Sequence, residues 1–156
     1  MISSTQIGCI GEGLVAAHLL MASDGRLSPF RPIADDAGVD LLIVDKLTRR
    51  SLSLQVKSRA GIDAGGTVQF DVRRETFISA PDAFLLAVLL DLTVGAVACS
   101  WIVPMTDLEG IAQPGSLTIV PSPKETSRDR YTPYRCHSIA EVCRRLTTAL
   151  ETRCSH

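Results

Sequence analysis

Two strand-like segments joined by a five-residue link constrain the fold of this chain more than any other feature. Residues 39–45 (VDLLIVD) are apolar between two aspartates, which is typical of a strand buried on both faces. Residues 51–58 (SLSLQVKS) alternate apolar and polar side chains, the period of a strand with one buried face. The link KLTRR is too short for a crossover connection, so the two segments are predicted to form an antiparallel hairpin.

This hairpin brings polar side chains opposite one another at the end far from its turn. A turn at residues 46–50 places Asp40 opposite residues 55–57 of the second strand. Gln55 and Lys57 share one face of that strand because successive side chains alternate. A strand that pairs with a buried strand is expected to carry few charges, so this polar face needs an explanation.

The periodicity elsewhere predicts helices and strands around the hairpin. Residues 4–23 suit a helix capped by Gly25, and a last helix begins at Ser138, with Glu141 completing a capping box. Further strands are expected near 27–33, 67–72, 82–91, 94–104 and 117–121, with a helix or turn at 73–79 and a polar loop within 115–135. The sequence therefore predicts one α+β domain over residues 1–156. Its central sheet is mixed but mostly antiparallel, and N-terminal and C-terminal helices flank it.

Glu12 occupies an unusual position on the first predicted helix. It shares a stripe with Val15, Ala16 and Leu19, at spacings of three, four and seven residues, which is a face expected to be buried. A carboxylate on such a face needs a cationic partner or a metal ion, or else it lies at the edge of the face. The sequence leaves both interpretations open.

Composition and charge do not identify a partner. The chain is 46% hydrophobic and 21% charged with a formal net charge of −1, so it is expected to fold and shows no overall preference for an anionic partner. The cations nevertheless gather in two clusters: Lys46, Arg49, Arg50, Lys57 and Arg59, and Lys124, Arg128, Arg130 and Arg135. Such clusters can bind phosphate, or they can be exposed loops with compensating acids. Likewise, Tyr131 and Tyr134 can stack on bases or anchor a long loop to the sheet.

The five cysteines show no paired spacing. Cys9 and Cys99 lie in apolar sequence, which is typical of core residues in a reducing compartment. The remaining candidates for a zinc site, Cys136, His137, Cys143, Cys154 and His156, lack the usual ligand spacing, so no zinc site is predicted. The sequence shows no signal peptide and no apolar run long enough to span a membrane, so we expect a soluble cytoplasmic protein without a membrane partner.

Order and residue types together resemble the PD-(D/E)XK nuclease superfamily. The stretches that carry the resemblance are IGEGLVAAHLL with Glu12, DDAGVDLL with Asp40, and LQVKSR with Gln55 and Lys57. The resemblance covers residues 5 to about 60 and implies a restriction-endonuclease-like core. It is closest to small bacterial members and to the Mrr-like branch, in which glutamine stands in place of the acid before the lysine.

The resemblance implies a metal-dependent endonuclease that hydrolyses phosphodiester bonds in DNA. Asp40 would be the principal ligand of Mg²⁺, which Mn²⁺ can replace, and Glu12 would bind the ion directly or through water. The amide oxygen of Gln55 and the carbonyl of Val56 would supply further oxygen ligands, which Mg²⁺ prefers. Lys57 would orient the attacking water or stabilise the pentavalent phosphate.

DNA is the partner that the resemblance implies, and five arginines are candidate phosphate contacts: Arg49, Arg50, Arg59, Arg128 and Arg130. An enzyme of this type that cuts both strands commonly acts as a homodimer. Asp36 is a candidate for an additional acid, although Asp35 and Asp36 also suit a polar turn.

Gln55 leaves the activity open, because a neutral amide is expected to bind a metal ion more weakly than a carboxylate. Two further functions therefore remain. The chain can be a catalytically inactive module that keeps the nuclease fold and binds nucleic acid or a protein partner. It can also be a small oligomer that assembles through an exposed apolar strand edge.

Overall fold

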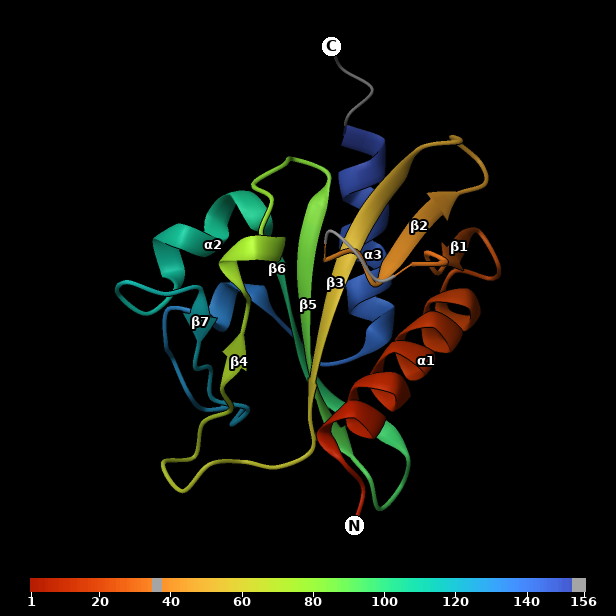
Figure 1. Cartoon of the computed structure of the whole chain (residues 1–156). Helices are drawn as coiled ribbons and strands as arrows, with labels where there is room; N and C mark the ends of the chain where they lie inside the picture. The colour runs from red at the N-terminus through yellow and green to blue at the C-terminus, as the bar shows by residue number, and fades with distance from the viewer. Residues whose placement is uncertain (35–37, 153–156) are drawn as a thin grey trace.

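A six-stranded sheet forms the centre of the computed structural model, which describes residues 1–34 and 38–152 (Figure 1). The strand order is β1-β2-β3-β5-β6-β8, and only β3 and β5 pair in parallel. The strands are β1 (Leu27–Phe30), β2 (Leu41–Asp45), β3 (Ser51–Arg59), β5 (Ala83–Asp91), β6 (Ala96–Pro104) and β8 (Arg135–Cys136). A separate two-stranded sheet joins β4 (Phe70–Asp71) to β7 (Thr118–Ile119). The predicted α+β fold with a mixed, mostly antiparallel sheet is confirmed.

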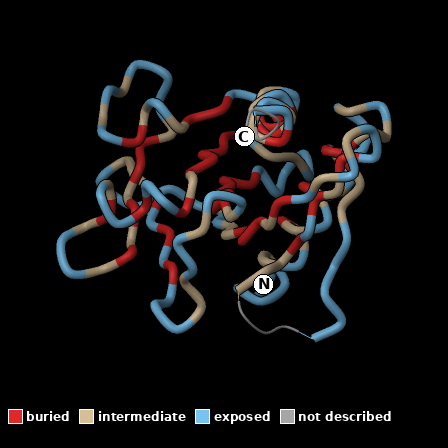
Figure 2. The backbone as a smooth tube through the Cα atoms, turned by 90° about the horizontal axis from the view of Figure 1, so that it is seen from above, coloured by how far each residue is buried: buried red, intermediate tan, exposed pale blue. Residues whose placement is uncertain are grey.

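Two layers cover this sheet. Helices α1 (Ser4–Ala22) and α3 (Ile139–Thr152) lie on one face, and α2 (Met105–Ile111) lies on the other with β4 and β7 (Figure 1). Two short 3₁₀ turns, η1 (Arg74–Thr76) and η2 (Thr132–Tyr134), connect strands. Seen from above, the buried segments run through the middle of the molecule and exposed loops surround them (Figure 2).

Local signals at helix ends were read correctly from the sequence. Gly25 has φ +76°, and its N–H donates to the carbonyl of Leu20 at 2.8 Å, as a left-handed cap requires. The hydroxyl of Ser138 accepts a hydrogen bond from the N–H of Glu141 at 3.2 Å, which is one half of the predicted capping box of α3. The carboxylate of Glu141 accepts from the N–H of His137 rather than from that of Ser138. These caps depend on a few neighbouring residues, so no tertiary information was needed.

Short elements differ from the prediction. The strand expected over 67–72 is only the two residues of β4, and the strand expected over 117–121 is only the two residues of β7. Helix α2 was not predicted. It has seven residues, too few to be stable alone, and it forms because Met105 and Leu108 are buried against the sheet.

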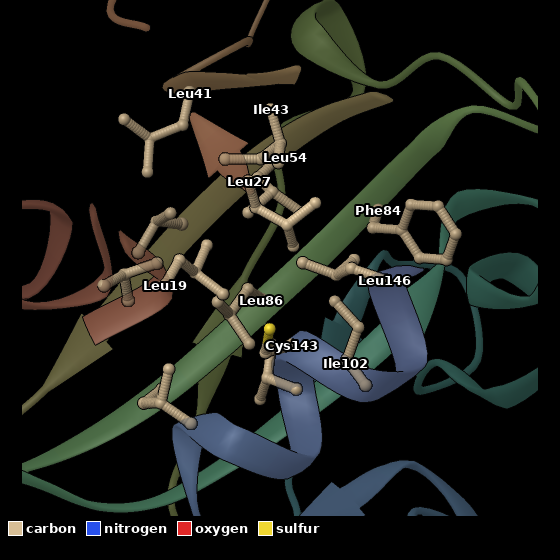
Figure 3. Close-up of a cluster of buried hydrophobic side chains, with 14 of the residues drawn as sticks. Leu19, Leu27, Leu41, Ile43, Leu54, Phe84, Leu86, Ile102, Cys143 and Leu146 are labelled. Carbon is tan, nitrogen blue, oxygen red and sulfur yellow. The ribbon is translucent and has the colours of Figure 1, made fainter. Parts of the chain in front are cut away.

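Apolar side chains on the two faces of the sheet enter two separate clusters. The first lies under α1 and α3, and it includes Leu54 of β3, Leu86 of β5 and Leu146 of α3 (Figure 3). The second lies under α2, β4 and β7, where Phe70 packs against Trp101 with ring centroids 5.8 Å apart. Strand β5 contributes to both clusters, whereas β3 contributes only to the first. One face of β3 therefore carries polar side chains.

The two edges of the sheet are poor surfaces for strand pairing. Strand β1 has four residues, and Pro29 within it has no N–H to donate. Strand β8 at the other edge has two residues. The long apolar strand β5 lies inside the sheet, so the apolar edge that self-assembly would need is not formed by this strand.

An ion pair around a buried carboxylate joins the residue before β1 to the end of β2. The Arg26 guanidinium donates two hydrogen bonds to the Asp45 carboxylate, both at 2.9 Å, and its Nη2 also lies 3.0 Å from Glu151 near the end of α3. Asp45 is fully buried and accepts further bonds from Thr48 and from the N–H of Leu47. The hydrogen bonds from Arg26 hold the pKa of Asp45 well below its ordinary value of 3.8, although burial raises it.

We expect Asp45→Asn to lower the free energy of unfolding at pH 7 by about 2 kcal/mol, because the neutral amide no longer pairs with the charge of Arg26 and accepts fewer of the hydrogen bonds that the buried carboxylate receives. The pKa of Asp45 is lower in the folded chain, so its contribution is complete well above pH 3.8 and shrinks as the pH falls below that value. Urea denaturation of the wild type and the variant at pH 7 and pH 3 measures this difference. Asp63→Asn, in an exposed loop, is the control. A difference independent of pH would contradict the assignment.

Helix α1 lies close to β3 because Gly11 has no side chain. A Cβ atom on Gly11 would lie 2.7 Å from the Cβ of Ser58, closer than real side chains approach. Gly13, two residues later, is exposed, and a Cβ there would meet nothing within 4 Å. The contact at Gly11 sets the height of α1 above the sheet and thereby the position of Glu12.

Alanine at these two glycines should have opposite effects on stability. Gly11→Ala should destabilise by about 1–3 kcal/mol, because the new methyl group separates α1 from β3. Gly13→Ala should stabilise by up to about 1 kcal/mol, because alanine favours the helix and no neighbour is displaced. Thermal denaturation of both variants measures the pair of effects. Equal effects would show that α1 does not depend on the contact at Gly11.

Among the described residues, α1 is the one helix that is long and apolar enough in composition to cross a membrane, although no such run was expected from the sequence. Core helices of soluble proteins and signal sequences meet the same criteria, so this is weak evidence for a span. In this structure Val15 and Leu19 of α1 are fully buried in the first core cluster.

Candidate metal and phosphate site

Asp40 lies where the ladder between β2 and β3 ends. The last pair is Leu41 with Leu54, and the N–H of Asp40 donates to the carbonyl of Leu54 at 2.9 Å. The next residue of β3 is Gln55, so Asp40 lies opposite the start of residues 55–57, as the hairpin register predicted. One carboxylate oxygen of Asp40 accepts a hydrogen bond from the N–H of Val56 at 2.6 Å. The side chain of Asp40 thus takes the place of strand backbone beyond the ladder.

The carbonyl of Val56 points toward the same edge of β3. In a β-strand, the N–H and C=O of one residue project to the same side, and the N–H of Val56 is directed at Asp40. The opposite edge of β3 pairs with β5 through the intervening residues. The backbone of Val56 and the carboxylate of Asp40 therefore meet at one place, as the proposed ligand set requires.

Glu12 and Asp40 line one pocket of about 170 Å³, with Arg31, Pro32 and Val39 completing its wall. Glu12 reaches the pocket from α1, and its side chain is 27% exposed. Its carboxylate lies 3.7 Å from the guanidinium of Arg31, which follows β1. Glu12 therefore has a cationic partner and, being partly exposed, also lies at the edge of the buried face of α1, so the structure agrees with part of each interpretation left open by the sequence.

Gln55 lines a neighbouring pocket, also of about 170 Å³, formed by the segment before β2, the residues after η1, and Met105. Gln55 is only 6% exposed, and its Oε1 is buried without a hydrogen-bond partner in the part of the chain that the structure describes. Val39 borders both pockets. Leu54 and Val56 face α1, so Gln55 between them faces the opposite side of β3 from Glu12.

Gly38 holds the segment before Asp40 against η1. Its φ is +66°, and a Cβ atom there would lie 2.6 Å from the carbonyl oxygen of Thr76. Both the backbone conformation and the space require glycine at this position. The position of Asp40 therefore depends on η1, which lies more than thirty residues further along the chain.

Lys57 is half-buried on the same face of β3 as Gln55, near a carboxylate that the sequence did not indicate. Asp71 of β4 accepts hydrogen bonds from Thr118 and Gln69 and lies 3.5 Å from Arg59. Burial raises the pKa of Asp71, but these hydrogen bonds and the charges of Arg59 and Lys57 outweigh it, so the pKa is lowered. No sequence signal identifies Asp71, because the path of the chain between β3 and β4 decides where it lies.

The five candidate DNA-contacting arginines do not form one patch. Arg49 and Arg50 precede β3 and Arg59 ends it, so they lie roughly 30 Å apart along the strand. Arg50 donates to the carbonyl of Leu150 at the end of α3, and Arg59 donates to the carbonyl of Gln69. Arg49, Arg128 and Arg130 are exposed, the last two in the loop before η2.

The other candidates from the sequence are placed as follows. Tyr131 is 3% exposed in the second core cluster, so it anchors the loop to the sheet. Cys136 and Cys143 are buried in the first cluster. Asp35, Asp36, Cys154 and His156 lie outside the described residues.

The oxygen atoms at this site suit a hard cation such as Mg²⁺. Two carboxylates share one pocket, the main chain of Val56 adjoins Asp40, and the amide of Gln55 lines the neighbouring pocket. Protein sites for Mg²⁺ commonly supply one or two carboxylates and leave other positions to water. Within residues 1–34 and 38–152, no three His, Cys, Asp or Glu side chains come together as a metal site. A cation here would therefore depend on the amide and the carbonyl as well as on Asp40 and Glu12.

Comparisons with known proteins identify the fold but not a family. No protein-family model matches the chain, and no curated protein matches it in sequence. Among solved structures, the bacterial homing endonuclease I-Ssp6803I is similar, with a TM-score of 0.67 and 20% sequence identity over 98% of each chain. At this identity the likeness shows the fold alone. The chain has a nuclease-like α+β fold over the part that the structure describes.

Gln55→Leu tests whether the buried amide oxygen is held for a ligand. Without divalent ions the variant should be more stable by about 1 kcal/mol, because an unpaired buried polar group is replaced by an apolar one of similar size. The stabilisation that Mn²⁺ gives the wild type should shrink in the variant. Thermal denaturation with and without MnCl₂ measures both. A less stable variant without metal would show that the amide already has a partner.

Proposed function

We propose that the protein is a divalent-metal-dependent nuclease of the PD-(D/E)XK type that cuts DNA. The observation that carries the proposal is the convergence of Asp40, Glu12 and the backbone of Val56 at the end of the β2–β3 ladder. The likeness in fold to a homing endonuclease, over 98% of each chain, supports it. We also expect the protein to act in the cytoplasm.

The metal ligands in this proposal are all oxygen atoms. Asp40 and Glu12 supply negative charge, Val56 supplies its carbonyl, and Gln55 supplies its amide oxygen. A bound Mg²⁺ or Mn²⁺ would neutralise charge on the scissile phosphate and lower the pKa of a bound water. Since Gln55 faces the other side of β3, it needs a change of rotamer or a water between it and the ion.

Lys57 supplies the positive charge that phosphodiester hydrolysis requires. It lies two residues beyond Gln55 on the same strand face, so a phosphate that contacts the Asp40 edge is within reach of its flexible side chain. Its role is to orient the attacking water or to stabilise the charge on the pentavalent phosphate. The charge of Lys57 in turn helps to lower the pKa of the nearby Asp71 carboxylate.

DNA would approach across the exposed arginines. Arg49 and Arg130 are exposed and can reach the phosphate backbone, whereas Arg50, Arg59 and Arg128 already donate hydrogen bonds to main-chain carbonyls. Two active sites are needed to cut both strands at once, so we propose that a homodimer forms on DNA.

Substitutions at the site test the catalytic proposal. Asp40→Asn and Lys57→Ala should each lower the rate of Mg²⁺- or Mn²⁺-dependent DNA cleavage by about 100-fold or more, because they remove ligand charge and phosphate stabilisation. Plasmid, nicked, branched and single-stranded DNA should all be assayed, with Asp63→Asn as the control. Wild-type protein that neither cleaves any of these substrates nor binds Mn²⁺ would refute the proposal.

A catalytically inactive module that binds nucleic acid is the second candidate. The neutral Gln55 on the far side of β3 favours it, since it leaves two carboxylates rather than three near the cation position. Such a module would bind DNA with a steep dependence on salt, and charge reversal at Arg128 or Arg130 would weaken binding without any cleavage to lose.

A further inference from the structure

Arg31 is a cation at the candidate metal site that no sequence motif assigns. Its guanidinium lies 3.7 Å from the carboxylate of Glu12, and both side chains line the pocket that Asp40 also borders. Arg31 is 50% exposed, so it enters this pocket from solvent. A positive group thus lines the same pocket as the two carboxylates that would bind a divalent ion.

We propose that Arg31 competes with the divalent ion for Glu12 and, once displaced, binds the phosphate of the DNA that is cut. This inference rests on the proposed function, since it concerns the same pocket. A guanidinium and a divalent cation that contact the same carboxylate repel each other. Binding of one to Glu12 therefore weakens the binding of the other. Arg31 therefore lowers the affinity of the pocket for metal when DNA is absent.

The geometry of the ion pair makes displacement easy. The separation of 3.7 Å is long for a charge-assisted hydrogen bond, and an exposed pair at this distance is weak. The Arg26–Asp45 pair in the same protein shows the contrast, with two bonds of 2.9 Å to a fully buried carboxylate. The Arg26–Asp45 pair is therefore strong and fixed, whereas the Arg31–Glu12 pair is weak enough for a ligand to displace Arg31.

A displaced Arg31 has a second use at this position. Its guanidinium presents a planar fork of donors that matches two phosphate oxygens, and half of the side chain is already in solvent. The phosphate attracted to the metal ion would lie beside the same pocket. Arg31 would then act as a substrate-binding residue, and its release would couple metal binding to DNA binding.

Isothermal titration with MnCl₂ on the full chain, without DNA, tests the competition directly. Arg31→Gln should bind Mn²⁺ about fivefold more tightly than the wild type, because the competing charge is removed. Arg31→Lys keeps the charge and should stay within about twofold of the wild type. Arg144→Gln is the matched control, because Arg144 on α3 also pairs with a half-buried glutamate at 3.7 Å, far from the site in sequence.

At saturating Mn²⁺, single-turnover cleavage of DNA tests the second role. Arg31→Gln and Arg31→Lys should both cleave more slowly than Arg144→Gln, because neither retains the bidentate fork. Thermal denaturation confirms that the variants are folded. If Arg31→Gln binds Mn²⁺ no more tightly than Arg144→Gln, the competition is refuted even though the nuclease proposal stands. If the wild type neither binds Mn²⁺ nor cleaves DNA, both proposals fail together.

Discussion

The candidate site depends on the unequal pairing of strand β3 along its two edges. On one edge β3 pairs in parallel with β5 from Ser53 to Arg59, and on the other it pairs with β2 only as far as Leu54. The backbone beyond Leu54 therefore needs other partners on the β2 side. The carboxylate of Asp40 supplies one by accepting the N–H of Val56. The unpaired edge of β3 thus holds the carboxylate of Asp40 in a position that the neighbouring strand pairing fixes.

The same unpaired edge lies between functional groups on the two faces of β3. The apolar side chains of β3 belong to the core under α1 and α3, and the polar side chains of Ser53, Gln55 and Lys57 face the side covered by β4. Glu12 approaches from the first side, and Gln55 and Lys57 lie on the second. These groups can act on a common ligand only beyond Leu54, where β2 no longer pairs with β3 and the edge of β3 is open. The site is therefore built across the edge of a strand rather than on a face of the sheet.

Two arginine–carboxylate pairs in the same molecule have different physical characters. Arg26 and Asp45 are held by short bidentate bonds around a buried carboxylate, so this pair stabilises the junction of β1, β2 and the turn. Arg31 and Glu12 are further apart and partly exposed, so their attraction is small and exchangeable. Residue types alone do not distinguish a structural pair from one that can yield to a ligand; burial and distance do.

The sequence by itself determined what depends on near neighbours. The hairpin register that places Asp40 beside Gln55 follows from a short turn and a two-residue period, and the caps at Gly25 and Ser138 follow from local hydrogen bonding. Only the tertiary structure decided which side of β3 each group faces relative to α1 and β4. It also brought Arg31 to Glu12 and Asp71 to Lys57. These contacts join segments that packing brings together, as at the close approaches of Gly11 and Gly38. Short-range sequence patterns do not predict such packing.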